Sequence, residues 1–215
     1  MNAPTCAKTP TRVGFDIDGV LAAFHVAYQE LVVLLTRKDL FKPGDADDPP
    51  CWNWPEFRGY TPVEIQTVWA HIHDSPMFWA YLPGTPFLWV ARRRLRALLL
   101  DPNVEVYFIS DRMGRYAKFQ TEDWLREHLD ISNVTVLLTP HKGRAAKLLS
   151  LDFYIDDRYE NVNDVAKKTR PATPHDFQRV LELKTPWLRW EADVMTGATL
   201  VAHTPYTQPY LLNRR

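Results

Sequence analysis

A regular alternation of short apolar runs with helix-like segments is the feature that most restricts the fold of this chain. Three apolar runs in the second half predict strands, at 104–110 (VEVYFIS), 134–138 (VTVLL) and 152–155 (DFYI). Helical segments follow these runs, at 116–129, 142–149 and 161–168. Strands that alternate with helices are typical of a parallel sheet with right-handed crossovers. We therefore expect an α/β fold built on a parallel sheet.

The first half of the chain adds one strand and three helices to this pattern. The run 13–17 (VGFDI) predicts a buried strand, because it is short, apolar and followed by Gly19. The segment 20–35 is apolar nearly all round and predicts a largely buried helix. Residues 61–64 (TPVE) form a strong helix start, with a capping threonine, a proline at the first helical position and a glutamate that closes a capping box. Residues 85–86 (TP) open another helix in the same way.

Acidic and hydroxyl side chains stand at the ends of three predicted strands. They are Asp16 and Asp18 after the first strand, Ser110 and Asp111 after the second, and Asp156 and Asp157 after the last. Ligands of an open parallel sheet bind beyond the carboxyl ends of its strands, so we expect these side chains to converge on one rim. Several uncompensated carboxylates would repel one another there at a cost of several kcal/mol. A divalent cation removes this conflict, and an all-oxygen ligand set favours Mg²⁺.

The same residues provide the groups that phosphoryl transfer needs. An aspartate beside Mg²⁺ can attack phosphorus and form an aspartyl-phosphate. A second carboxylate two residues later projects to the same side of an extended strand, where it can protonate the leaving oxygen and then activate water. The hydroxyl and the backbone N–H of Ser110–Asp111 can hold phosphate oxygens.

A lysine should neutralise the remaining phosphate charge, and two lysines compete for this role. Lys142 stands at the start of the helix that precedes the last strand. This helix runs antiparallel to the strand, so its first turn should lie at the rim that holds Asp156. Lys147 lies five residues further along, roughly 7–8 Å away along the helix axis. We prefer Lys142 and keep Lys147 as the alternative.

The chemical motifs occur in the order found in a known superfamily. FDIDGVL (15–21), FIS with Asp111, a helix-leading lysine and DFYIDDR (152–158) resemble the four motifs of the haloacid dehalogenase-like phosphatases. Within that superfamily the chain resembles the 5'(3')-deoxyribonucleotidases. They share the DxDGVLA opening, an aromatic residue eight positions after the first aspartate, here Phe24, a return segment loosely matched by MFWAYLPGTP (77–86), and a terminal IDDR.

The resemblance implies a Rossmann-like three-layer core and assigns roles to the rim residues. Asp16 would be the nucleophile and Asp18 the acid/base. Mg²⁺ would be held by the Asp16 carboxylate, the Asp18 carbonyl and Asp157. Asp156 would support them, and phosphate would be bound by Ser110, Asp111 and Lys142.

The resemblance also implies a division into two domains. Residues 1–19 and 82–215 would form the haloacid dehalogenase-like core, and residues 20–81 a small helical cap that closes over the site and selects the substrate. Aromatic side chains of this segment are candidates for stacking on a nucleobase, which is worth about 1–3 kcal/mol per base. They are Phe24, Trp52, Trp54 and Tyr60. The alternative is that the tryptophans form the core of the cap itself.

Other polar residues have plainer interpretations. His71 and His73 are two positions apart and cannot share a helix face for metal binding, so we interpret them as structural or exposed. Arg112 stands where the nucleotidases more often place small residues or proline, and it either contacts phosphate or pairs with Asp111. Residues 169–198 are interpreted as an insertion before a further strand at 199–206.

The expected activity is Mg²⁺-dependent hydrolysis of (deoxy)ribonucleoside monophosphates through an aspartyl-phosphate. The alternatives are another small phosphate ester or a polynucleotide 3'-phosphate as the substrate, and, outside enzymes, a non-catalytic nucleotide-sensing module. The 26 basic and 26 acidic residues balance, which argues against polymeric nucleic acid as a partner. An exposed aromatic patch in the cap or tail would make a homodimer plausible.

The remaining sequence signals favour a cytoplasmic protein. The two cysteines provide no disulfide framework, so a reducing compartment is the simpler reading. The first residues lack the apolar stretch of a secretory signal. No apolar run approaches the ~18 residues that a membrane span needs, so we expect no membrane partner.

Overall fold

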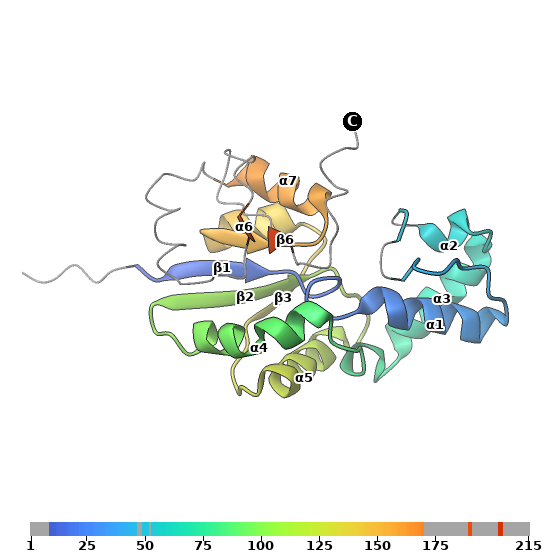
Figure 1. The fold of residues 1–215 in the computed structure, drawn as a ribbon, viewed down its shortest axis with the longest axis horizontal. Coiled ribbons are helices and arrows are strands. Elements are labelled where there is room, and N and C mark those ends of the chain that lie inside the picture. Colours follow the sequence, from blue (N-terminus) through green and yellow to red (C-terminus); the bar gives the residue numbers. More distant parts are fainter. Residues whose placement is uncertain (1–8, 47–48, 52, 170–188, 191–201, 204–215) are drawn as a thin grey trace, which may run out of the picture.

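The computed structural model describes residues 9–46, 49–51, 53–169, 189–190 and 202–203. Its central feature is a four-stranded parallel sheet with the strand order β3-β2-β1-β4 (Figure 1). The strands are β1 (Thr11–Phe15), β2 (Val104–Ser110), β3 (Val136–Leu138) and β4 (Phe153–Ile155). The α/β fold with a parallel sheet predicted from the sequence is therefore confirmed.

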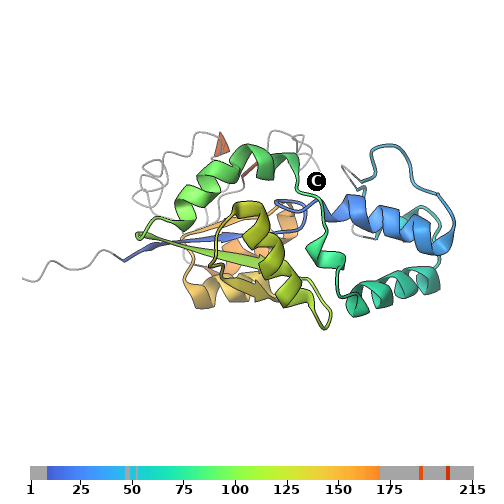
Figure 2. The same ribbon diagram turned by 90° about the horizontal axis from the view of Figure 1, so that it is seen from below.

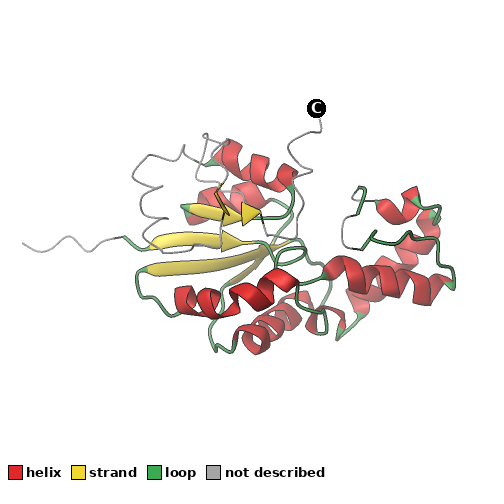
Figure 3. Ribbon diagram, viewed as in Figure 1, coloured by secondary structure: helices red, strands yellow, loops and turns green. Residues whose placement is uncertain are grey.

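Helices cover both faces of this sheet and produce three layers (Figures 1 and 3). One face carries α4 (Pro86–Leu99) and α5 (Ala117–Leu129). The other carries α6 (Lys142–Leu149) and α7 (Tyr159–Lys168). Since both faces are covered, the central strands are buried on both sides, with Phe108 and Ile109 of β2 fully inaccessible to solvent.

A second group of helices lies beyond the carboxyl ends of the strands (Figures 1 and 2). It consists of α1 (Phe24–Thr36), α2 (Trp54–Phe57) and α3 (Pro62–Asp74), and the short helix η1 (Phe78–Ala80) leads back to the sheet. The predicted capping box is present, because the Thr61 hydroxyl accepts from the Glu64 N–H and the Glu64 carboxylate accepts from the Thr61 N–H. These helices occupy the segment expected to form the cap, although the domain boundaries stay a prediction.

The segment after β1 differs from the prediction of a helix that begins at residue 20. The chain first makes a tight turn, in which Gly19 N–H donates to Ala22 and Leu21 N–H donates to Ile17, and α1 starts only at Phe24. Val20 and Leu21 are apolar because the turn is buried, not because it is helical. A continuous apolar run does not distinguish these two cases.

The C-terminal part of the chain is described only in two short strands. β5 (Arg189–Trp190) pairs antiparallel with β6 (Ala202–His203), which falls inside the strand predicted at 199–206. The rest of the interpreted insertion after Thr169 lies outside the described residues. Among the helices that the structure describes, none has the length and apolar character needed to cross a membrane.

Candidate active site

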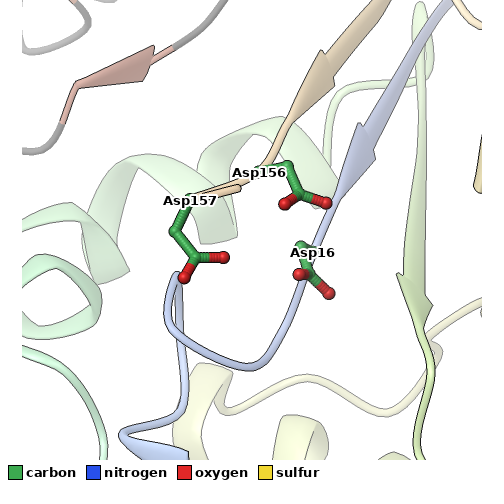
Figure 4. A group of neighbouring side chains, drawn as sticks. All are labelled: Asp16, Asp156 and Asp157. Carbon is green, nitrogen blue, oxygen red and sulfur yellow. The ribbon is translucent and has the colours of Figure 1, made fainter. Parts of the chain in front are cut away.

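Three aspartates meet where β1 and β4 end (Figure 4). Each of Asp16, Asp156 and Asp157 offers a carboxylate oxygen within 4.8 Å of the others. The pairing of β1 with β4 causes this convergence, because Phe15 is level with Ile155 and the Asp16 N–H donates to the Ile155 carbonyl at 2.8 Å. We call Asp16, Asp18, Asp156 and Asp157 the acidic rim.

The Asp156 carboxylate is fully engaged by protein donors. One oxygen accepts from Lys142 Nζ at 3.0 Å and from the Tyr154 hydroxyl at 2.8 Å. The other accepts from the Arg158 N–H and from Asn161 Nδ2, both at 2.9 Å. A carboxylate with four donors has little capacity left for a metal, so its geometry suits a supporting role.

Asp157 has the opposite environment. Its Oδ1 atom is buried and has no hydrogen-bond partner among the described residues. Burial raises the pKa of Asp157 to about 7, and the charge of Asp156 contributes in the same direction. Gly19 makes room for this carboxylate, because a Cβ there would stand 2.1 Å from Asp157 Oδ2 and the Gly19 φ of 84° also favours glycine.

Lys142 is the lysine of the site. Its Nζ lies 2.5 Å from Asp16 Oδ2 and 3.0 Å from Asp156 Oδ2, and the side chain is buried. Lys147 is exposed on the same helix, so of the two candidates it is Lys142 that lies at the acidic rim. The reason is the direction of α6, which places its first residue and not its sixth at the rim.

The charges of this buried pair depend on each other. Burial alone would lower the pKa of Lys142, but Asp16 and Asp156 outweigh it and raise that pKa above its usual value. Burial raises the pKa of Asp16 well above 3.8, which Lys142 opposes and the other rim carboxylates reinforce. A bound cation would relieve the repulsion that remains.

Asp18 is held by a hydroxyl and a guanidinium. Ser110 Oγ donates to Asp18 Oδ2 at 2.9 Å, while Arg112 Nη2 donates to Oδ1 at 2.8 Å and Arg112 Nε to Oδ2 at 3.0 Å. The Arg112 side chain is fully buried, lies over the Trp79 ring at 5.0 Å and also donates to Thr121. Of the two sequence-based readings of Arg112, pairing with Asp111 is therefore wrong, because the carboxylate it binds is that of Asp18.

A cavity of about 350 Å³ opens above the acidic rim. The strand ends contribute its charged floor, which includes Asp16, Asp18, Ser110, Asp111, Lys142 and Asp157. Its opposite side consists mainly of aromatic rings, and we call this side the cap wall: Phe24, His25, Trp69, His73 and Trp79. Asp111 is the exposed member of the floor. Neighbouring protein atoms still remove part of its hydration, and this desolvation raises the pKa of Asp111. The cavity thus joins a charged end to an end lined mainly by aromatic rings.

The four aromatic candidates for base stacking have different positions. Phe24 belongs to the cap wall and stacks on Trp79 at 5.7 Å and on Trp69 at 6.0 Å. Trp54 and Tyr60 are buried instead inside the cap, where Trp54 packs on Tyr28 and the Tyr60 hydroxyl donates to the Lys38 carbonyl, and neither is among the described residues that line the cavity. Trp52 lies outside the described residues.

Two cavity residues were missed by reasoning from the sequence. Trp69 falls at the spacing of buried helix residues, and His73 was interpreted as structural or exposed, yet both line the cavity. They are four residues apart on α3 and share one face of it. That spacing was visible in the sequence, but which helix face meets the sheet edge was not.

The rim and cavity agree with a family comparison. A protein-family model described as "5' nucleotidase, deoxy (Pyrimidine), cytosolic type C protein" matches residues 10–174, which is most of the chain and includes the whole acidic rim. The chain belongs to this family. The protein is accordingly a phosphoric monoester hydrolase of the 5'-nucleotidase type. A search of curated proteins finds no match.

Solved structures give weaker similarities to this nucleotidase. A haloacid dehalogenase superfamily hydrolase of subfamily IA from Geobacter sulfurreducens is 15% identical, with a TM-score of 0.43 over 74% of this chain and 86% of that one. A haloacid dehalogenase-like hydrolase from Xanthomonas campestris is 14% identical, with a TM-score of 0.35 over 71% and 76%. A haloacid dehalogenase family enzyme from Bacteroides thetaiotaomicron, solved as a magnesium complex, is 15% identical. Its TM-score is 0.36 over 81% of this chain and 99% of that one.

Proposed function

We propose that this protein is a Mg²⁺-dependent 5'-nucleotidase that hydrolyses nucleoside monophosphates, with deoxyribonucleotides preferred, through an aspartyl-phosphate on Asp16. The observation that carries the proposal is the contrast between the carboxylates at the end of β4. Asp156 is saturated by four donors and holds Lys142, whereas the buried Oδ1 of Asp157 finds no partner in the described part of the chain. This contrast supports a cation site at Asp157, and the family match supports a nucleotide as the substrate.

The donor set fits Mg²⁺. All side-chain ligands would be carboxylate oxygens, from Asp16 and Asp157, and a backbone carbonyl at Asp18 would add a third oxygen. Two carboxylates leave room for waters and a phosphate oxygen, which Mg²⁺ usually retains. When bound, the ion would neutralise the carboxylates and polarise the phosphoryl group.

The protein residues can carry out both halves of the reaction. In the first, an Asp16 oxygen forms a bond to phosphorus while the ester P–O bond breaks, and Asp18 donates a proton to the leaving oxygen. In the second, Asp18 takes a proton from water, the water oxygen bonds to phosphorus, and the Asp16–phosphorus bond breaks. Asp18 stands two residues after Asp16 and is kept in place by Ser110 and Arg112.

The cationic and hydroxyl groups of the floor bind the transferred phosphoryl group. Lys142 already touches Asp16 at 2.5 Å, so it lies beside the atom that would be phosphorylated. Ser110 Oγ donates to Asp18 in the free protein and can turn toward a phosphate oxygen once substrate enters. These groups act on charge that develops at phosphorus, which is where preorganised donors contribute most.

The cap wall favours a flat organic group on the phosphate. Phe24, Trp69 and Trp79 present ring surfaces to the same cavity, and rings of this kind stack on nucleobases. Phe24 and Trp79 are nearly buried, so Trp69 is the ring of this group that keeps an accessible surface for a base. Trp54 and Tyr60 would stabilise the cap and not contact the base.

A phosphate-release screen tests the proposal. Deoxyribo- and ribonucleoside 5'- and 3'-monophosphates, sugar phosphates and a polynucleotide 3'-phosphate are incubated with Mg²⁺ or with a chelator, with Asp16→Asn as the inactive control. We expect release from nucleoside monophosphates only with Mg²⁺, and a loss of at least ~10³-fold in Asp16→Asn. Full activity of Asp16→Asn would refute the mechanism, and faster release from sugar phosphates or from the polynucleotide would refute the substrate class. Tight nucleotide binding with no release in Mg²⁺ would favour a sensing module instead.

A further inference from the structure

His73 lines the substrate cavity, and one polar atom of its ring has no hydrogen-bond partner among the residues that the structure describes. The residue lies in the last turn of α3 and lines the cavity together with Trp69, one turn earlier, at 6.1 Å between ring centroids. Its Nε2 atom is buried and makes no hydrogen bond to any residue that the structure describes. A buried polar atom without a partner costs about 1–3 kcal/mol, so such atoms usually meet water or a ligand.

The backbone of His73 is fixed to the catalytic core. Its carbonyl accepts from the Arg115 N–H at 3.2 Å, in the loop that follows Ser110 and Arg112. Gly114 permits this approach, because a Cβ there would stand 2.7 Å from the His73 carbonyl oxygen and the Gly114 φ is 121°. The imidazole therefore has a defined position relative to the acidic rim, although it belongs to a cap helix.

The other polar groups of the cavity already have partners or a different role. Asp18, Ser110 and Arg112 bind one another at the floor. His25 packs edge-on against Trp54 at 5.3 Å, and burial lowers its pKa. His73 consequently offers the unsatisfied polar contact of the cap wall, beside the ring surfaces on which a base would stack.

We infer that His73 is a specificity-determining residue whose Nε2 hydrogen-bonds the polar edge of the substrate's nucleobase while the base stacks on Trp69 and Phe24. An imidazole nitrogen donates or accepts according to its tautomer, so it can pair with a ring carbonyl or with a ring N–H. The inference rests on the proposed nucleotidase function. It adds a contact to the base, by which the protein would prefer a nucleotide over a phosphate ester of equal charge that has no base.

The test compares two substrates that differ only in the base. Thymidine 5'-monophosphate is chosen because the family description specifies deoxy and pyrimidine, and 2-deoxyribose 5-phosphate is its base-free counterpart. His73→Phe keeps the ring packing on Trp69 and removes the nitrogen, whereas His73→Gln keeps a nitrogen or oxygen at a similar reach. His71→Phe is the matched control, since His71 is exposed on the same helix.

We expect His73→Phe to lower kcat/KM for the nucleotide about tenfold, mainly through KM, and to change it by less than about twofold for the base-free ester. His73→Gln should recover part of the loss, and His71→Phe should behave as the wild type. Thermal unfolding of each variant verifies that the cap is folded. Equal effects on both substrates, or an unchanged preference in His73→Phe, would overturn the inference. If the wild type itself shows no preference for the nucleotide, the proposed substrate class fails first and the inference fails with it.

Discussion

The floor and the cap wall of the active-site cavity are built on different principles. On the floor, Asp18, Asp156 and Lys142 are held by protein partners, and most side chains follow strand ends whose register is fixed by the sheet. The cap wall projects from α1, α3 and η1 and offers stacked rings plus an imidazole nitrogen with no partner in the described structure. In the proposed nucleotidase, the reacting groups would thus be fixed by strand ends, whereas the residues that select the substrate would come mainly from helix faces.

The comparison predicts the largest loss of catalytic activity in a variant that disturbs the floor directly. In Gly19→Ala, the new methyl group would collide with the Asp157 carboxylate, so we expect kcat/KM to fall by about 10²-fold. Gly44→Ala is the matched control, because Gly44 has a similar φ of 88° and a Cβ there meets no described atom within 4 Å. Steady-state phosphate release measures both variants. Similar losses in both would mean that backbone strain, and not the Asp157 contact, explains the effect.

A smaller loss is expected when one support of the floor is removed. Tyr154→Phe deletes the hydroxyl that donates to Asp156 at 2.8 Å and leaves Asp156 with three donors. Since Asp156 positions Lys142, we expect kcat to fall about tenfold with little change in KM. Tyr107→Phe on β2 of the same sheet is the control, because its hydroxyl donates to Glu105 away from the rim. An unchanged kcat in Tyr154→Phe would show that the other donors suffice to orient Asp156.

The cap wall should respond in KM and in selectivity. Trp69→Leu removes a ring surface from the cavity, and we expect the KM for nucleotides to rise by several-fold, in line with the loss of about 1–2 kcal/mol of stacking. Trp54→Leu should lower thermal stability by opening the cap interior and leave the preference for nucleotides over sugar phosphates unchanged. If Trp54→Leu altered the preference as strongly as Trp69→Leu, the separation of cap wall from cap interior would be wrong.

The smallest expected effect is on the thermal stability of the protein, measured as a function of pH with a chelator present to keep the site free of metal. The pKa of Asp157 is raised to about 7 in the fold, above its usual 3.8, so the folded state binds more protons than the unfolded state between these values. Its contribution therefore favours folding at low pH and is lost as the pH rises toward 7. Asp157→Asn should accordingly raise Tm more at pH 8 than at pH 5, where part of the contribution is still present.

Mg²⁺ provides the control for this experiment. Binding to the folded state should raise the Tm of the wild type at pH 8 and have a weaker effect on Asp157→Asn. If Asp157→Asn raised Tm equally at both pH values, the stabilisation would not come from removing the buried charge of Asp157. If Mg²⁺ raised the Tm of the wild type and of Asp157→Asn equally, Asp157 would not be a ligand.

The sequence allowed the grouping of the acidic side chains to be predicted, because these side chains follow the ends of parallel strands. The sheet, the helix starts at Pro62 and Pro86 and the convergence of Asp16 with Asp157 all follow from local patterns and from the rule that parallel strands end at one edge. The turn at 20–23 was mistaken for helix, because burial makes both apolar. Trp54 was offered as a base platform although it fills the cap interior, because an aromatic residue is suited to either place.

The sequence by itself determined the order of the motifs, the parallel sheet and the acidic rim, since these depend on periodicity and on the ends of strands. Only the tertiary structure decided that Asp156 has four donors while Asp157 Oδ1 has no partner among the described residues, that Arg112 holds Asp18, and that Trp69 and His73 line the cavity. The physical reason is distance along the chain. Neighbours within a few residues fix secondary structure, but the partner of a side chain comes from elements that the sequence does not place in space.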